Sequence, residues 1–267
     1  MKNKIVIVTG ASSGIGKATA LIFAQKGAHL VLAARSVAKL NILLEQLTPF
    51  GVEVLIVPTD VSKEADCKNL MDKALEKFGR IDVLVNNAGI SMRAAFADLE
   101  LDVLKKVMDV NFWGTVFCTR YAMGSILKSK GSIVGVSSIA GYKGLPGRTG
   151  YSSSKFAMHG FLESIRIENL KKGIHVLIAC PGFTASNIRN TALDSNGSVQ
   201  GETPRDEQKM MQPEEVAKAI VIAVEKRKDR LTLTTNGKLT VFLNKFFPKM
   251  VDKLVFNHMS KEPGSPF

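Results

Sequence analysis

Short apolar runs alternate along this chain with longer stretches of helical periodicity, and no other feature restricts its fold as strongly. Runs rich in β-branched residues recur six times before residue 180, and a seventh, weaker one follows near residue 231. Repeated strand–helix units predict a parallel sheet with helices on both faces, and β-branched runs suit strands buried on both sides. The sequence therefore predicts one α/β domain built on a doubly wound parallel sheet of about seven strands.

The same pattern predicts where the elements lie. Strands are expected at 5–8, 30–33, 52–57, 81–85, 132–136, 174–179 and 231–235. Helices are expected near 14–26, 36–48, 62–78, 99–128, 152–171 and 213–226. The segment 182–211 is polar and weakly periodic, and a loop of this length is usually a lid over a site or disordered.

Composition and charge exclude several classes of protein. Cys67, Cys118 and Cys180 have neither C-x-x-C nor metal-ligand spacing, so we expect buried thiols in a reducing compartment and no metal site. The four histidines are scattered, and we assign them no role. No apolar run approaches ~18 residues, and the first run is too short for a signal peptide, so we expect a cytoplasmic protein.

The net charge of +12 is uneven, because residues 226–262 hold nine Lys or Arg and three acidic residues. A basic chain can indicate nucleic acid or an anionic membrane as its partner. We favour a solvated basic surface that also attracts a polyanionic cofactor. We therefore expect no nucleic-acid partner, and membrane contact stays open for the C-terminal segment alone.

A glycine-rich turn follows the first expected strand. Gly10, Gly14 and Gly16 would allow a tight turn and the close approach of backbone N–H groups to a pyrophosphate at the positive end of the next helix. Because the spacing is not G-x-G-x-x-G, an ordinary strand–helix turn is the alternative interpretation.

A tyrosine and a lysine lie four residues apart further along the chain. On a helix, Tyr151 and Lys155 would point into the same space. A phenol with a pKa of ~10 transfers protons poorly at neutral pH, and a fixed cation favours its phenolate form. We therefore expect Lys155 to lower the pKa of Tyr151 and to make it a general acid or base.

These residues belong to a longer series of motifs, through which the chain resembles the short-chain dehydrogenase/reductase family. The matching segments, in chain order, are Thr9–Gly16, Asp60-Val61, Asn86-Asn87-Ala88-Gly89, Asn111, Ser138, Tyr151 with Lys155, and Pro181-Gly182. Seven short motifs in the expected order and spacing make the resemblance specific. It implies a Rossmann-type fold and an oxidoreductase that interconverts a ketone and a secondary alcohol by hydride transfer with a nicotinamide cofactor.

The resemblance also implies a role for each catalytic residue. Tyr151 would be the general acid or base, and Lys155 would lower its pKa and hold the nicotinamide ribose. Ser138 would hydrogen-bond the substrate oxygen, and Asn111 would hold a helix irregularity and a water that relays protons. Neither a core nor a surface requires this combination of spacings.

The implied cofactor contacts extend along the carboxyl edge of the sheet. They are Gly10, Ser12, Ser13, Gly14, Ile15 and Gly16 at the turn; Asp60 and Val61 at the adenine; Asn86, Ala88 and Gly89 toward the adenosine; Tyr151 and Lys155; and Pro181, Gly182 and Thr184 beside the nicotinamide. For Asp60 an alternative is the cap of a helix that begins near Ser62. Arg35 stands nineteen residues after Gly16, where an acidic residue would select NAD, and its guanidinium matches a 2′-phosphate. The sequence therefore predicts NADP(H), although Ser13 occupies a place where many NADP-preferring relatives carry a basic residue.

The chain continues past the seventh expected strand. We expect residues 1–235 to form the dinucleotide-binding and catalytic domain, with 182–211 as a substrate lid, and 236–267 to be a helical extension of the same domain. Pro248 should split this extension into two short helices, and the tail Glu262–Phe267 is expected to fray. Its apolar and lysine residues fit either a flap over the substrate or an interfacial helix on anionic lipid. Similar extensions occur in relatives that act on steroids and lipid-like ketones.

Three functions remain open at this stage. The first is an NADP(H)-dependent oxidoreductase that interconverts a small ketone and its secondary alcohol, with lipid-like or steroid-like compounds among the candidate substrates. The second is an NADP-binding regulatory protein without turnover, against which the complete set Asn111, Ser138, Tyr151 and Lys155 argues. The third is a ketoacyl-thioester reductase, although those relatives usually end soon after the seventh strand. The family resemblance also implies a homodimer or homotetramer.

Overall fold

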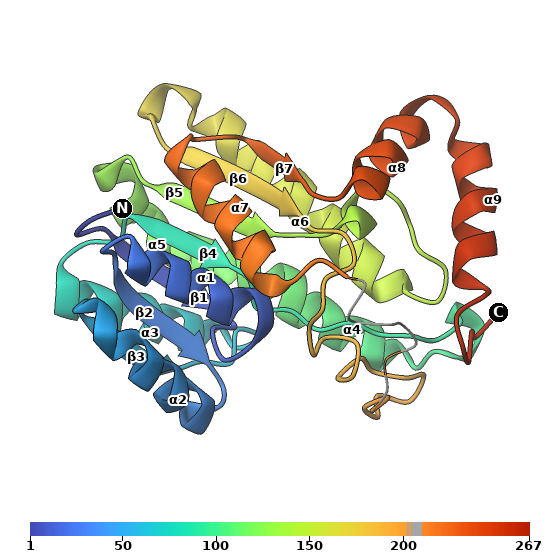
Figure 1. Ribbon diagram of the computed structural model, residues 1–267, viewed down its shortest axis with the longest axis horizontal. Helices are drawn as coiled ribbons and strands as arrows, with labels where there is room; N and C mark the ends of the chain where they lie inside the picture. Colours follow the sequence, from blue (N-terminus) through green and yellow to red (C-terminus); the bar gives the residue numbers. More distant parts are fainter. Residues whose placement is uncertain (202, 204–209) are drawn as a thin grey trace.

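The computed structural model describes residues 1–201, 203 and 210–267, and its centre is one parallel sheet (Figure 1). The strand order is β3-β2-β1-β4-β5-β6-β7, and every neighbouring pair is parallel. The strands are β1 Ile5–Thr9, β2 His29–Ala34, β3 Val54–Pro58, β4 Val83–Asn86, β5 Ser132–Val136, β6 His175–Cys180 and β7 Arg230–Thr232. This confirms the predicted doubly wound sheet, with the change in winding direction between β1 and β4.

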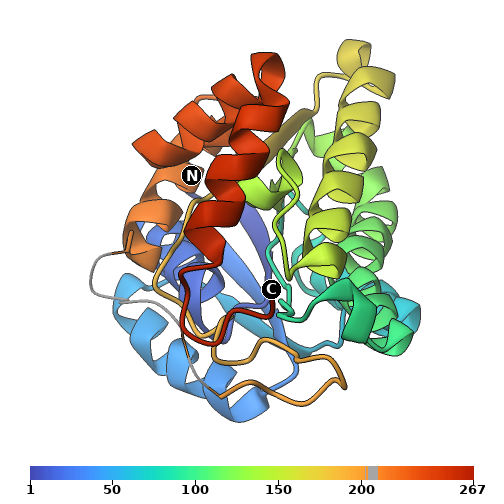
Figure 2. The ribbon, with the colours of Figure 1, turned by 90° about the vertical axis from the view of Figure 1, so that its right-hand side faces the viewer.

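Helices cover both faces of the sheet, as Figure 2 shows. One core cluster joins the sheet to α1, α2 and α7, and a second joins the opposite face to α3, α5 and α6. The helices are α1 Gly14–Gln25, α2 Val37–Leu47, α3 Glu64–Phe78, α4 Leu101–Met108, α5 Gly114–Ser129, α6 Thr149–Glu168, α7 Pro213–Glu225, α8 Thr235–Phe246 and α9 Pro248–Met259. The strands are buried on both sides because each face carries its own helical layer.

One expected helix is interrupted. The stretch 99–128 forms α4 and α5, separated by a π-helical turn at Asp109–Trp113. Gly114 opens α5 against Val61, whose Cγ2 would lie 2.8 Å from a Cβ at that glycine. The helix irregularity that was expected at Asn111 is therefore present. Gly114 lets the start of α5 approach Val61, which lies in the loop after β3.

The C-terminal extension lies beyond the carboxyl ends of the strands (Figures 1 and 2). Pro248 begins α9 directly after α8, which confirms the predicted division into two helices. The prediction that the tail Glu262–Phe267 frays is wrong for its first residue. Glu262 is buried and pairs with Arg93 at 3.7 Å and Arg148 at 3.9 Å, because two guanidinium groups next to the site attract its carboxylate.

Candidate active site

The glycine-rich turn fits a pyrophosphate. Gly10 has φ +65°, and a Cβ on Gly16 would lie 2.3 Å from the Gly10 carbonyl oxygen. The helix α1 begins at Gly14, and Ser13 at its N-cap makes no side-chain capping bond within the described chain. The first N–H groups of α1 therefore face a glycine-lined cradle that has the backbone geometry for an anion.

The turn is held by a side chain that the sequence analysis did not single out. The Asn87 Nδ2 donates to the carbonyl oxygens of Thr9 at 2.9 Å and Gly10 at 3.3 Å. Asn86 donates instead to Thr119 Oγ1 at 3.1 Å and is 2% exposed, so its side chain faces α5. The amide beside the glycine turn is therefore Asn87. Neighbouring residues of a strand point to opposite faces of the sheet, so only one of the two adjacent asparagines could face the turn. The sequence could therefore have indicated Asn87 as a candidate.

The residues expected at the adenosine end lie together beyond β2 and β3. Asp60 accepts hydrogen bonds from the backbone N–H of Ser62 at 3.1 Å and its hydroxyl at 2.7 Å. Burial acts to raise the pKa of Asp60, but the bonds from Ser62 and the charge of Arg35 outweigh it and the pKa is lowered. Arg35 itself is exposed. Asp60 does not cap α3, which begins at Glu64, so the alternative interpretation of this aspartate is wrong.

The expected catalytic residues converge where β5 ends. Tyr151 and Lys155 share one face of α6, and the lysine Nζ lies 5.6 Å from the centroid of the phenol ring. Lys155 Nζ donates to the Val136 carbonyl oxygen at 2.9 Å. Ser138 follows β5 and accepts the backbone N–H of Ala140 at 3.1 Å, and its hydroxyl lies close enough to Tyr151 to act on the pKa of the phenol. Phenol, ammonium and serine hydroxyl therefore meet at the carboxyl edge of the sheet, where open α/β sheets bind ligands.

Burial dominates the acidity of both α6 groups. Burial raises the pKa of Tyr151 above its ordinary value, and the Ser138 hydrogen bond and the Arg148 charge oppose this only in part. Burial lowers the pKa of Lys155 to about 8. The expectation that Lys155 lowers the tyrosine pKa is therefore wrong for this structure, because the buried setting disfavours the charged form of both groups.

Asn111 occupies the π-helical turn and faces the same region. Its Nδ2 donates to the Ile90 carbonyl oxygen and to Ser154 Oγ, both at 2.9 Å. Its Oδ1 would lie 3.1 Å from a Cβ on Gly89, and Lys155 Nζ would lie 3.7 Å from the same point. Asn111 Oδ1 and Lys155 Nζ therefore both lie next to Gly89, where a side chain larger than glycine's would meet them.

The segment after β6 carries the residues expected beside the nicotinamide. The Pro181 carbonyl accepts from the backbone N–H of Ile139, and a Cβ on Gly182 would lie 2.7 Å from Thr234 Oγ1. Thr184 is buried and donates to the Gly182 carbonyl oxygen at 3.2 Å. Part of the expected lid, at 202 and 204–209, lies outside the described residues. In the described part of the lid, the Cβ of Ser186 would lie 3.4 Å from a Cβ added to Gly14. The lid segment thus passes close to the glycine turn.

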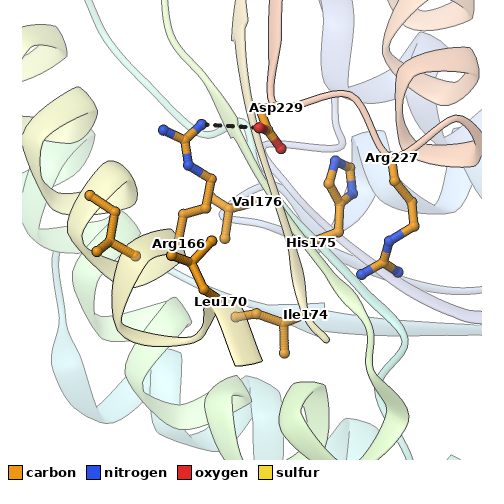
Figure 3. Close-up of a pocket in the computed structure, with 8 residues that line it drawn as sticks. Arg166, Leu170, Ile174, His175, Val176, Arg227 and Asp229 are labelled. Atoms are coloured by element: carbon orange, nitrogen blue, oxygen red, sulfur yellow. Dashed lines mark ion pairs between the residues drawn. The ribbon is translucent and has the colours of Figure 1, made fainter. Parts of the chain in front are cut away.

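A separate cavity of about 370 Å³ lies at the opposite, amino end of β6 and β7 (Figure 3). Its charged groups already have protein partners. Arg166 pairs with Asp229 at 3.5 Å, and Arg227 Nη2 donates to the Gly173 carbonyl oxygen at 2.6 Å. His175 Nε2 lies 2.9 Å from the Lys228 carbonyl oxygen. The residues that line this cavity lie near the amino ends of β6 and β7, and none of them belongs to the predicted site.

Comparison with known proteins identifies the family. The family model for short chain dehydrogenase matches residues 4–196. The chain is 34% identical over 270 residues to 11-beta-hydroxysteroid dehydrogenase A of Sesamum indicum, covering 98% of this chain and 77% of that one. The chain belongs to the short-chain dehydrogenase/reductase family, whose members are oxidoreductases that bind NAD or NADP.

Two solved structures show both cofactors on this fold. A short-chain dehydrogenase/reductase from Burkholderia phymatum, in complex with NAD, has a TM-score of 0.83 and 25% identity, covering 93% of this chain and 95% of that one. An alcohol dehydrogenase from Thermococcus sibiricus, with 5-hydroxy-NADP, has a TM-score of 0.76 and 27% identity, covering 86% and 94%. Within the described residues, no helix has both the length and the apolar character needed to cross a bilayer.

Proposed function

We propose that this protein is an NADP(H)-dependent oxidoreductase that interconverts a ketone and a secondary alcohol in the cytoplasm. The observation that carries the proposal is the convergence of Tyr151, Ser138 and Lys155 beside the glycine-rich turn at one sheet edge. A regulatory protein without turnover would not need these three groups together. The extension after β7 disfavours a ketoacyl-thioester reductase.

The residues divide the work as follows. A bound nicotinamide dinucleotide would supply the hydride donor or acceptor. Gly10, Gly14 and Gly16 would hold its pyrophosphate at the start of α1, and the ammonium of Lys155 would hold the nicotinamide ribose. Ser138 orients the carbonyl oxygen, and Tyr151 donates a proton to that oxygen as the carbonyl carbon is reduced.

Cofactor binding offers a way to lower the pKa of Tyr151. Lys155 is buried with its pKa lowered to about 8, so its ammonium form is stabilised by any new hydrogen-bond acceptor. Ribose hydroxyl oxygens are such acceptors. A fully protonated Lys155 then favours the tyrosinate, and the general acid–base pair comes closer to its working range only when the cofactor is present.

Replacement of the phenol oxygen tests the reaction. Tyr151→Phe should lower kcat by roughly 10²–10⁴-fold, the usual contribution of a positioned acid or base, and leave the Kd for NADPH within about twofold. The assay is NADPH oxidation with ketosteroids, 3-ketosphinganine, β-ketoacyl thioesters and small diketones. Tyr121→Phe is the matched control, since that phenol donates to Glu64 on the outside of α5. Full turnover in Tyr151→Phe contradicts the assignment.

The substrate side of the site favours an apolar carbonyl compound. Phe183, at the start of the lid, contacts His258 of α9 with ring centroids 6.4 Å apart. The α8–α9 extension also exposes large apolar side chains, among them Phe242, Phe246 and Phe247 at 59%, 63% and 56%. We propose that the extension is a flap whose inner side covers a lipid-like or steroid-like substrate.

A second proposal gives the same exposed side chains a different partner. The exposed phenylalanines of the extension and its lysines 245, 249 and 253 match the composition of an interfacial helix on an anionic lipid surface. Co-sedimentation with phosphatidylglycerol vesicles should be strong at low salt and weak at high salt. Replacing the three lysines by glutamate should abolish it without changing kcat. Absence of vesicle binding at low salt would leave only the flap.

The quaternary structure is also a proposal. Trp113, the last residue of the π-helical turn before α5, and Phe156 of α6 are each 45% exposed. Exposed aromatic residues on paired helices are suited to contact with a second copy. We propose a homodimer or homotetramer assembled through these helices, and sedimentation velocity of the Phe156→Glu variant tests it.

A further inference from the structure

A third side chain of α6 reaches the segment that carries the catalytic serine. His159 lies four residues after Lys155 on the same helix face and is 7% exposed. Its Nε2 lies 2.7 Å from Ser137 Oγ and 3.6 Å from Cys180 Sγ. Its ring also packs edge-on against Tyr142, with centroids 4.7 Å apart.

Three side chains of α6 lie against three successive residues, the last residue of β5 and the two that follow it. Lys155 binds the carbonyl oxygen of Val136, His159 binds the hydroxyl of Ser137, and Tyr151 lies beside the hydroxyl of Ser138, which acts on its pKa. Ser137 is held from its other side as well, because its backbone N–H donates to the Ala179 carbonyl oxygen at 2.7 Å. A rotation of this segment therefore cannot occur without breaking the His159 contact.

The turn that follows Ser138 closes directly on this pair. A Cβ on Gly141 would lie 2.6 Å from His159 Nε2 and 2.9 Å from Ser137 Oγ, so the position requires glycine. Ser138 lies between the anchored Ser137 and this turn, and its hydroxyl accepts the Ala140 N–H. The direction of the Ser138 hydroxyl therefore depends on where His159 fixes Ser137.

His159, Ser137 and Cys180 form a cluster that fixes the position of Ser137 and does not carry protons near pH 7. Burial lowers the pKa of His159 to about 4, with the charges of Arg230 on β7 and Lys155 on α6 acting in the same sense. Burial raises the pKa of Cys180 to about 12, opposed by its bond with Tyr142 and the charge of Lys155. Imidazole and thiol are therefore both neutral near pH 7.

We propose that His159 is a positioning residue, which fixes Ser137 through its Nε2 and thereby holds the Ser138 hydroxyl against Tyr151. The effect of His159 on kinetics rests on the proposed function. The position of the Ser138 hydroxyl does not depend on turnover and can be measured separately. The sequence analysis assigned His159 nothing, because its partners are 22 and 21 residues away along the chain.

Two substitutions separate the role of Nε2 from simple packing. In His159→Gln the amide reaches the place of Nε2, whereas in His159→Asn it ends near Nδ1. We expect His159→Asn to lower kcat by roughly 10²-fold, the scale of a 1 Å misplacement, with KM for NADPH within about twofold. His159→Gln should recover most of the loss. Ser137→Ala removes the same hydrogen bond with little change in volume and should behave like His159→Asn.

NMR spectroscopy of the tyrosine rings measures the environment of Tyr151 without turnover and complements the kinetics. The chain has three tyrosines, so ¹³Cζ-tyrosine NMR resolves Tyr151 and the Tyr151→Phe variant assigns its signal. Displacement of the Ser138 hydroxyl from the phenol should move this resonance at pH 7 in His159→Asn and Ser137→Ala, but not in His159→Gln. His175→Gln is the matched control. It changes another buried histidine, bonded to Ser132 and the Lys228 carbonyl, and should lower the melting temperature without moving the resonance.

The outcomes distinguish this inference from the proposed function. If wild type oxidises no NADPH with any carbonyl compound, the proposed function fails and the resonance decides the positioning role. An unmoved Tyr151 resonance in both His159→Asn and Ser137→Ala overturns the role of His159. So does an equal loss of kcat in His159→Gln and His159→Asn, because packing alone would then explain the effect.

Discussion

A single side chain, Arg35, carries the proposal that the cofactor is NADP(H). Arg35 is exposed just beyond β2 and close enough to Asp60 for its charge to lower the aspartate pKa. An acidic side chain here would select NAD, whereas a guanidinium can pair with a 2′-phosphate through two parallel hydrogen bonds. We therefore expect selectivity between NADP and NAD to depend on this surface residue.

Arg35→Asp should reverse the cofactor preference. Loss of a charge-assisted contact, about 1.5–3 kcal/mol, together with new repulsion should raise the KM for NADPH roughly 10- to 100-fold and leave NADH unaffected or improved. Steady-state kinetics with both cofactors measure the effect. Lys73→Asp, which makes the same charge change on the outer side of α3, is the control. Unchanged discrimination would mean that another group recognises the phosphate.

Whole elements, rather than single residues, enclose the substrate side. Three polar contacts tie the C-terminal extension to separate loops of the site. Asp252 of α9 pairs with Lys143, Asn244 of α8 donates to the Tyr142 carbonyl oxygen at 3.1 Å, and Glu262 of the tail lies between two arginines. The extension is thus connected to the loop between Ser138 and Tyr151 and to the loop after β4.

Glu262→Gln tests whether the tail supports the site. The variant leaves Arg93 and Arg148 without the buried carboxylate, and we expect a loss of about 2–3 kcal/mol in the free energy of unfolding. Because Arg148 is next to the start of α6, KM for the carbonyl substrate should rise more than KM for NADPH. Denaturant unfolding and kinetics measure both effects. Glu225→Gln, which breaks the exposed pair with Lys26, should change neither by as much.

For the whole molecule, buried bases link stability to pH. The pKa of His159 falls from 6.5 in the unfolded chain to about 4 in the fold, so between these values the unfolded state binds more protons. The free energy of unfolding should therefore fall as pH falls from 6.5 toward 4, by about 3 kcal/mol from this residue. Lys155, with a pKa lowered to about 8, adds stability as pH rises from 8 toward 10.5.

His159→Gln should flatten the acid part of this dependence. Urea unfolding at pH 7, 6, 5 and 4 gives the free energy of unfolding for both proteins. The difference between wild type and variant isolates the histidine from carboxylates that titrate in the same range. Parallel curves over this range would contradict a buried, neutral imidazole.

Strands and most helices were predictable from the chain because their signals are local. Apolar runs such as Ile5–Val8 and the alternation with amphipathic stretches specify a buried parallel sheet, and Pro248 alone specifies the division between α8 and α9. The break between α4 and α5 was not visible in the hydrophobic pattern. It depends on a contact between Gly114 and Val61, which are more than fifty residues apart.

The sequence alone determined the sheet and the glycine turn and indicated the groups that we propose to react, since each follows from short-range periodicity or from a motif of a few residues. Only the tertiary structure decided the direction in which the pKa values of those groups shift, which asparagine supports the turn, that His159 contacts Ser137, and that Glu262 is buried against Arg93 and Arg148. These properties depend on burial and on partners distant in the chain. Desolvation and hydrogen-bond geometry are set when distant segments pack together, and no local pattern records them.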